Sequence, residues 1–201
     1  MDRKPVSVKS YANIAIVKYW GKADAKRMIP STSSISLTLE NMYTETKLSS
    51  LPEDATSDVM YIDDDLQGEK ETTKASKVLD LFRTNPNKHV KIETWNNMPT
   101  AAGLSSSSSG LSALVKAANE LFQVGKTQSE LAQIAKFASG SSSRSFFGPL
   151  AAWDKDSGEV YQVETDLKLA MIMLVLTDQK KPVSSRDGMK LCTETSTSFP
   201  E

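Results

Sequence analysis

Apolar and polar residues alternate along much of the first hundred positions, which is typical of strands that bury one face. The alternating segments are rich in β-branched and aromatic residues and are separated by short polar stretches. This pattern predicts strands over 5–17, 34–40, 43–49, 58–63 and 89–95, with a turn at Asn41-Met42 joining the second to the third.

Apolar residues recur at three- and four-residue steps in three other segments, which predicts amphipathic helices. The helices are expected over 72–83, directly behind a serine run at 105–109, and over 128–138, where Ser129 is the expected N-cap. Strands then return at 150–154 and 159–164, the apolar run 169–176 is expected to be a central strand, and 185–195 is expected to be helical. Because strands and helices do not alternate regularly, the pattern predicts an α+β fold with a mixed, mainly antiparallel sheet and helices packed on it.

Composition narrows the classes of function. The chain has 201 residues, 39% of them hydrophobic, and a formal net charge of -1. No global positive field attracts nucleic acid or an anionic membrane, so we expect a small-molecule ligand. The single cysteine, Cys192, excludes an internal disulfide, and the longest apolar run is too short to span a bilayer. We therefore expect a cytoplasmic protein.

The serine run lies in the sequence PTAAGLSSSSSG at 99–110, immediately before the second expected helix. The first turn of a helix presents unpaired backbone N–H groups and the positive end of the helix dipole, and serine hydroxyls add further donors. Gly103 would let the backbone approach a ligand closely. The residues alone leave two interpretations open, a phosphate-binding loop and a plain serine-capped helix.

Three further stretches place cations among aromatic, small or hydroxyl residues. They are KYWGK at 18–22, SGSSSRS at 139–145 and DQKKPVSSRDG at 178–188. Each of them alone is more typical of an exposed surface segment than of a binding site. The only histidine, His89, and the acidic run 63–65 have no partner motif for metal binding or catalysis, so we expect them to be surface or strand residues.

In their order and spacing, these stretches resemble the motifs of the mevalonate diphosphate decarboxylase family. The resemblance is carried by ANIAIVKYWGK at 12–22, PTAAGLSSSSSG at 99–110 and ASGSSSRSFFG at 138–148. The family is a branch of the superfamily that contains galactokinase, homoserine kinase, mevalonate kinase and phosphomevalonate kinase. The resemblance implies a ribosomal protein S5 domain 2-like fold, with an N-terminal ATP- and substrate-binding domain at 1–182 and the start of a truncated C-terminal domain at 183–201.

The resemblance also implies an activity. Family members use Mg-ATP to phosphorylate the tertiary hydroxyl of mevalonate 5-diphosphate, and loss of phosphate and carbon dioxide then gives isopentenyl diphosphate for isoprenoid biosynthesis. ATP and Mg²⁺ are the implied cofactors, and a homodimer is the implied assembly of the full-length protein.

The resemblance assigns roles to individual residues. Lys18 is expected beside the reacting hydroxyl, Arg144 on the carboxylate of the substrate, and Ser106 near the metal. The residues expected at the nucleotide are Gly103, Leu104, Ser105, Ser106, Ser107, Ser108, Ser109, Lys180 and Lys181. The residues expected at the substrate are Lys18, Tyr19, Trp20, Gly21, Lys22, Ser139, Gly140, Ser141, Ser142, Ser143, Arg144, Arg186 and Thr195.

The chain departs from the family pattern in two ways. Family members usually have alanine at the positions of Ser108 and Ser142, which is a small change. Their catalytic aspartate lies in a C-terminal Asp-Ala-Gly-Pro-Asn motif that these 201 residues lack, so we expect the chain to be an inactive N-terminal portion. Two alternatives stay open: another small-molecule kinase of the superfamily, against which KYWGK and SGSSSRS argue, and a noncatalytic ligand-binding domain.

Overall fold

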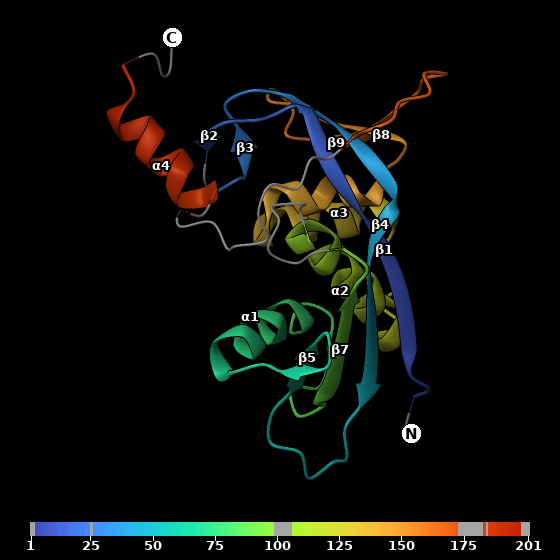
Figure 1. Ribbon diagram of the computed structural model, residues 1–201. Helices are drawn as coiled ribbons and strands as arrows, with labels where there is room; N and C mark the ends of the chain where they lie inside the picture. Colours follow the sequence, from blue (N-terminus) through green and yellow to red (C-terminus); the bar gives the residue numbers. More distant parts are fainter. Residues whose placement is uncertain (1–2, 25, 99–105, 173–182, 184, 198–201) are drawn as a thin grey trace.

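A seven-stranded sheet forms the centre of the computed structural model, which describes residues 3–24, 26–98, 106–172, 183 and 185–197 (Figure 1). Six strands follow the order β6-β5-β7-β4-β8-β9, and β1 pairs with β4 as well. All pairs are antiparallel except β5 with β7, so the prediction of a mainly antiparallel sheet is confirmed. The strands are β1 (Val6–Val17), β4 (Ser34–Ser50), β5 (Val59–Ile62), β6 (Asp65–Leu66), β7 (Val90–Asn96), β8 (Leu150–Trp153) and β9 (Val160–Val163), with a separate pair, β2 (Lys22–Asp24) and β3 (Ile29–Pro30).

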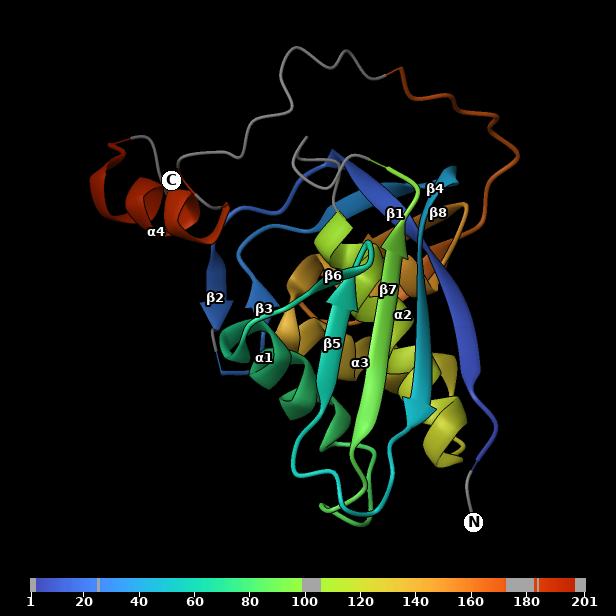
Figure 2. The same cartoon turned by 60° about the horizontal axis from the view of Figure 1, so that its bottom comes forward.

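Three helices, α1 (Glu69–Leu79), α2 (Ser106–Phe122) and α3 (Gln128–Ala138), cover one face of the sheet (Figure 2). A 3₁₀ helix, η1 (Gly140–Phe146), follows α3 directly, and α4 (Ser185–Thr195) lies apart from the other helices, beyond β2 and β3 (Figure 1). The α+β prediction is therefore confirmed.

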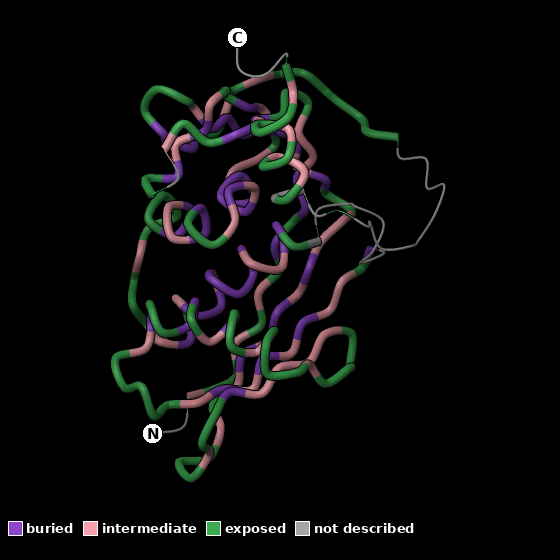
Figure 3. Tube along the Cα trace, turned by 90° about the vertical axis from the view of Figure 1, so that its left-hand side faces the viewer, coloured by how far each residue is buried: buried purple, intermediate pink, exposed green. Residues whose placement is uncertain are grey.

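The main core lies between the sheet and these helices, where the buried turns of the trace gather (Figure 3). Leu48 and Ile92 of the sheet pack there with Val115 and Leu121 of α2 and Leu79 of α1. The opposite face of the sheet carries Lys9, Glu45 and Lys47, and the Lys9–Glu45 pair bridges β1 and β4. The alternation in the sequence thus reports a sheet that is buried on one side and solvated on the other.

The expected turn at Asn41-Met42 is wrong, because β4 is one continuous strand of 17 residues. The pairing of β1 with β4 explains the irregular pattern. Tyr11 pairs with Tyr43 but the next residue, Ala12, pairs with Leu39, so residues 40–42 form a bulge. A bulge leaves extra residues unpaired without reversing the chain.

Several helix boundaries also differ from the prediction. Helix α1 spans Glu69–Leu79 where 72–83 was expected. Helix α2 begins at Ser106, so most of the serines expected to precede it lie in its first turn. Helix α3 is capped by Thr127 in place of Ser129. The Thr127 hydroxyl accepts from the Glu130 amide while the Glu130 carboxylate accepts from the Thr127 amide. This reciprocal capping box satisfies two helix-end donors, which a cap at Ser129 would not do.

The expected central strand over 169–176 is wrong where the structure describes it. Residues 169–172 form no strand, and Ile172 is 85% exposed. Strand β9 pairs only with β8 among the described residues, so no neighbouring strand receives this run. The rest of the run lies outside the described residues. Within the described part of the chain, no helix is long and apolar enough to cross a membrane.

Candidate functional site

Arg144 is a buried cation that no carboxylate of the described residues neutralises. It lies on η1 with 2% exposure, and its guanidinium donates from Nε to Ser36 Oγ and from Nη1 to Ser34 Oγ, both at 3.1 Å. Burial lowers the pKa of Arg144 to about 10, so the side chain still carries its charge at neutral pH. A buried charge without a counter-ion is costly. Among the described residues its partners are two serine hydroxyls and the Tyr19 ring, none of which carries a negative charge at neutral pH.

Tyr19 and Trp153 form the wall beside Arg144. The Tyr19 ring centroid lies 5.6 Å from Arg144 Cζ, and the ring meets Trp153 edge-on with centroids 4.8 Å apart. Gly140 lies against both aromatic residues. A Cβ atom at this position would come within 2.9 Å of Trp153 and 3.0 Å of the Tyr19 hydroxyl. The first residue of η1 must therefore be glycine for the loop to approach the wall.

Asn13 on β1 anchors the opposite side of η1. Its Nδ2 donates to Ser145 Oγ at 2.8 Å and to the Ser141 carbonyl at 3.0 Å. Its Oδ1 is buried with no hydrogen-bond partner among the described residues. The sequence analysis missed Asn13 and Trp153 as site residues. The signal for Asn13 was present, because an amide in the middle of an apolar strand must find partners when it is buried.

The expected nucleotide residues divide into three groups. Ser107, in the first turn of α2, is exposed. Ser108 and Ser109 are fully buried: Asn13 Nδ2 donates to Ser108 Oγ at 3.5 Å, and Ser109 Oγ bonds with Thr44 Oγ1 at 2.7 Å. This departs from the expectation that these two hydroxyls face a ligand. The third group lies outside the described residues and consists of Gly103, Leu104, Ser105, Lys180, Lys181 and the side chain of Ser106.

The substrate loop is likewise only partly accessible. Ser139 and Ser141 are half-buried, with their hydroxyls 3.3 Å apart. Ser142 and Ser143 are fully buried, and the Ser143 hydroxyl donates to the Gly140 carbonyl. Ser142 and Ser143 therefore depart from the expectation of direct substrate contact, because their side chains are directed into the fold.

The segment 18–22 combines exposed cations with a buried ring. Lys18 and Lys22 are exposed while Tyr19 is buried, and Lys18 Nζ lies 5.8 Å from the Trp20 ring centroid. Gly21 has a φ of 81°, a conformation that favours glycine.

Helix α4 carries the two remaining expected contacts. Thr195 is exposed, but its hydroxyl donates to the Leu191 carbonyl at 2.7 Å. The side chain of Arg186 lies outside the described residues. No group of three or more histidine, cysteine, aspartate or glutamate side chains that could hold a metal occurs among the described residues.

A comparison with protein families matches residues 10–163 to the diphosphomevalonate decarboxylase-like N-terminal domain. The match covers β1, the start of α2 and η1, the elements that build the site. The chain belongs to this family.

Known relatives agree with this assignment. The chain is similar to mevalonate pyrophosphate decarboxylase from Streptococcus pyogenes, with 67% identity and a TM-score of 0.92 over 99% of this chain and 63% of that one. It is 35% identical to the diphosphomevalonate decarboxylase of Saccharomyces cerevisiae over 97% of this chain and 55% of that protein. A third relative, MDDEF in complex with MVAPP, AMPPCP and magnesium, has 36% identity and a TM-score of 0.79 over 96% of this chain and 62% of that one. The chain thus spans between about half and two thirds of the length of these relatives.

Proposed function

We propose that this chain supplies the nucleotide- and substrate-binding part of a diphosphomevalonate decarboxylase. The reaction consumes ATP and mevalonate 5-diphosphate and yields isopentenyl diphosphate, ADP, phosphate and carbon dioxide. The observation that supports it best is Arg144, a buried guanidinium without a carboxylate partner on a loop of the family. An anionic carboxylate end of the substrate is the counter-ion that this position lacks.

The chain's own residues would orient the substrate between two groups of donors. Arg144 is already fixed by Ser34 and Ser36, so it can receive a carboxylate without a large loss of side-chain entropy. Lys18 and Lys22 are exposed on the adjoining segment; Lys22 would meet the diphosphate and Lys18 would lie beside the reacting hydroxyl. Holding the carboxylate and the diphosphate separately leaves the tertiary hydroxyl between them for phosphoryl transfer.

The start of α2 would hold the nucleotide. Its first-turn amides point out of the helix end, and the helix dipole favours the phosphates there. When bound, Mg²⁺ would offset the negative charge of the phosphate groups. The described residues contain no carboxylate cluster for a metal, which fits an ion held mainly through phosphates and a serine hydroxyl. Ser106 is the residue proposed for that contact.

The proposal leaves the general base outside these 201 residues, because they contain no Asp-Ala-Gly-Pro-Asn sequence. The homodimer and the cytoplasmic location stay predictions. The proposal is supported by the family match and by the similarity to a diphosphomevalonate decarboxylase and a mevalonate pyrophosphate decarboxylase.

The test is an assay of the complete natural gene product with mevalonate 5-diphosphate labelled in its carboxylate and with Mg-ATP. We expect labelled carbon dioxide and ADP in equal amounts. ADP release without carbon dioxide would instead indicate a small-molecule kinase of the same superfamily. Binding of both ligands with no turnover would indicate a noncatalytic domain.

A further inference from the structure

Lys116, on α2, is a half-buried cation beside η1. Its Nζ donates to Ser10 Oγ at 3.2 Å and to the Ser145 carbonyl at 3.4 Å, and lies 4.9 Å from the Phe146 ring centroid. No carboxylate of the described residues pairs with it, and burial lowers the pKa of the Lys116 ammonium. Hydrogen bonds to neutral acceptors offset only part of the free energy needed to remove an ammonium from water.

Lys116 ends a polar stripe on the otherwise apolar inner face of α2. The stripe consists of Ser108, Ser112 and Lys116, which are spaced four residues apart and so lie on one side of the helix. Ser108 and Ser112 are fully buried, and Ser112 Oγ bonds with Ser10 Oγ at 2.7 Å. The stripe leads from the first turn of α2, the proposed nucleotide end, to the Ser145 carbonyl of η1.

Ser145 is held at two points and immediately follows Arg144 in η1. Its carbonyl accepts from Lys116 and from Ser10, and its hydroxyl accepts from Asn13. The guanidinium of Arg144 donates separately to the hydroxyls of Ser34 and Ser36 on β4. The position of Arg144 therefore depends on bonds at both its backbone and its guanidinium, and Lys116 is the charged member of the backbone set.

We propose that Lys116 is a positioning residue for the anionic substrate. It holds η1 so that Arg144 stays in place, and it adds a second uncompensated positive charge to the loop that would bind the anion. The proposal rests on the proposed function. It gives a role to a half-buried ammonium that has no carboxylate partner among the described residues, because an anion bound at η1 would be attracted by both cations.

The experiment uses the complete natural protein and compares Lys116→Met with the wild type. Methionine keeps most of the side-chain volume and removes the ammonium. We expect the dissociation constant for mevalonate 5-diphosphate, measured by calorimetry, to rise at least about tenfold. The KM for ATP should change much less. The melting temperature should change little, because Lys116 is only half-buried and its hydrogen-bond partners are neutral.

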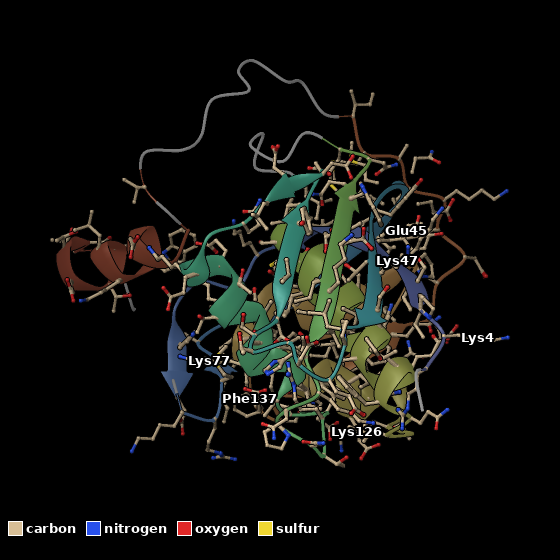
Figure 4. All side chains as sticks on the ribbon, turned by 90° about the horizontal axis from the view of Figure 1, so that it is seen from below. Lys4, Glu45, Lys47, Lys77, Lys126 and Phe137 are labelled. Atoms are coloured by element: carbon tan, nitrogen blue, oxygen red, sulfur yellow. The ribbon has the colours of Figure 1, made fainter. Side chains whose placement is uncertain are left out.

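Lys77→Met is the matched control, because Lys77 is an exposed lysine on α1 (Figure 4). It should leave the substrate affinity, the KM for ATP and the melting temperature unchanged. A folded Lys116→Met protein that binds mevalonate 5-diphosphate as the wild type does would overturn the proposal, and Lys116 would then be a tether alone. If the methionine variant does not fold, Lys116→Gln, which also removes the charge, is measured against the same expectation.

Failure of the proposed function gives a different result. A wild-type protein that releases no carbon dioxide refutes the decarboxylase, whereas equal activity and affinity of the wild type and Lys116→Met refute only the role of Lys116. If the wild type does not bind mevalonate 5-diphosphate, inorganic pyrophosphate is the probe. Equal pyrophosphate affinity of the two proteins then overturns the positioning role, and a weaker affinity of the variant supports it.

Discussion

The ring of Tyr19 lies over the guanidinium of Arg144, with 5.6 Å between the ring centroid and Cζ. Two hydroxyls of β4 accept from the same guanidinium, so its plane and direction are both fixed. We expect Arg144→Lys to lower turnover of the full-length enzyme at least about tenfold, equivalent to about 1.4 kcal/mol of transition-state stabilisation. A lysine ammonium has no planar fork to bind two serines and a carboxylate together.

Steady-state decarboxylation assays check this expectation. Arg27→Lys provides the control, because Arg27 is an exposed arginine in the turn between β2 and β3. It should turn over as the wild type does. Near-normal turnover by Arg144→Lys would show that the guanidinium does not grip the substrate.

Much of this fold could be predicted, because the periodicity of a strand or helix is local to its own sequence. Strands β1, β5, β7, β8 and β9 and helices α3 and α4 lie where the patterns place them, within one residue at each end. Helix α2 was also expected, but it begins at Ser106, inside the serine run that was expected to precede it. The predicted turn at Asn41-Met42 was wrong, because a bulge at residues 40–42 interrupts the apolar–polar alternation in the same way that a turn does. The pattern also failed at 169–172, because an apolar run does not reveal whether a neighbouring strand is present to pair with it.

The candidate site was predicted in its cations and small residues but not in their supports. Arg144 and Gly140 stand in recognisable sequence motifs. Trp153 and Asn13 do not, because their roles arise from contacts with η1, more than a hundred positions from Asn13. The burial of Ser108 and Ser109 within a serine run was equally invisible, since a run of identical residues does not show which of them lie on the buried face of the helix.

Ser107→Glu tests whether the first turn of α2 receives the nucleotide phosphates. Ser107 is exposed there, so a carboxylate should repel the phosphates and weaken ATP binding at least about tenfold. The same charge suits the helix dipole, so the melting temperature should not fall. Calorimetry with Mg-ATP and a thermal scan of the full-length protein measure both effects.

Ser129→Glu is the matched control for this variant. Ser129 is exposed in the first turn of α3, where the dipole effect is the same but no motif for phosphate occurs. ATP affinity should match that of the wild type. If both variants bind ATP equally well, the nucleotide does not lie at the start of α2.

Gly140→Ala tests the close approach of η1 to its aromatic wall. The added methyl would come within 2.9 Å of Trp153, so the loop or the ring must shift. We expect a loss of about 1–3 kcal/mol in the free energy of unfolding and a weaker substrate affinity. Denaturant titration and calorimetry of the full-length protein provide the two measurements.

Gly110→Ala is the contrasting variant, at a glycine where an added methyl group fits without a clash. Gly110 lies in α2, and the nearest atom to its added Cβ would be Thr44 Cγ2 at 4.0 Å, an ordinary contact. Alanine favours helix, so stability should rise by up to about 1 kcal/mol. If Gly140→Ala is as stable as the wild type, Tyr19 and Trp153 can move to accommodate the added methyl group with no loss in the free energy of unfolding.

The last prediction concerns Asp58, whose side chain is buried in an ion pair with Arg83. Arg83 Nη2 donates to Asp58 Oδ2 at 2.7 Å, Ser76 Oγ donates to the same oxygen at 2.6 Å, and the Val90 amide donates to Oδ1 at 2.8 Å. Burial by itself would raise the pKa of Asp58, but these donors outweigh it and hold the pKa below its ordinary value of 3.8. The ionised carboxylate therefore stabilises the folded state above that value, and the contribution is lost as the pH falls through the lower folded pKa.

We expect Asp58→Asn to lower the free energy of unfolding by about 3 kcal/mol at pH 7, because it leaves the buried Arg83 guanidinium with only its pair to the exposed Asp80. The difference from the wild type should narrow below about pH 4, where the wild-type carboxylate also becomes neutral. Asp156→Asn is the control, because the Asp156 side chain is 80% exposed in its pair with Lys155 and should matter little at either pH. Denaturant titrations of the full-length protein at both pH values decide: a difference that stays constant from pH 7 to pH 3 would show that ionisation of Asp58 does not stabilise the fold.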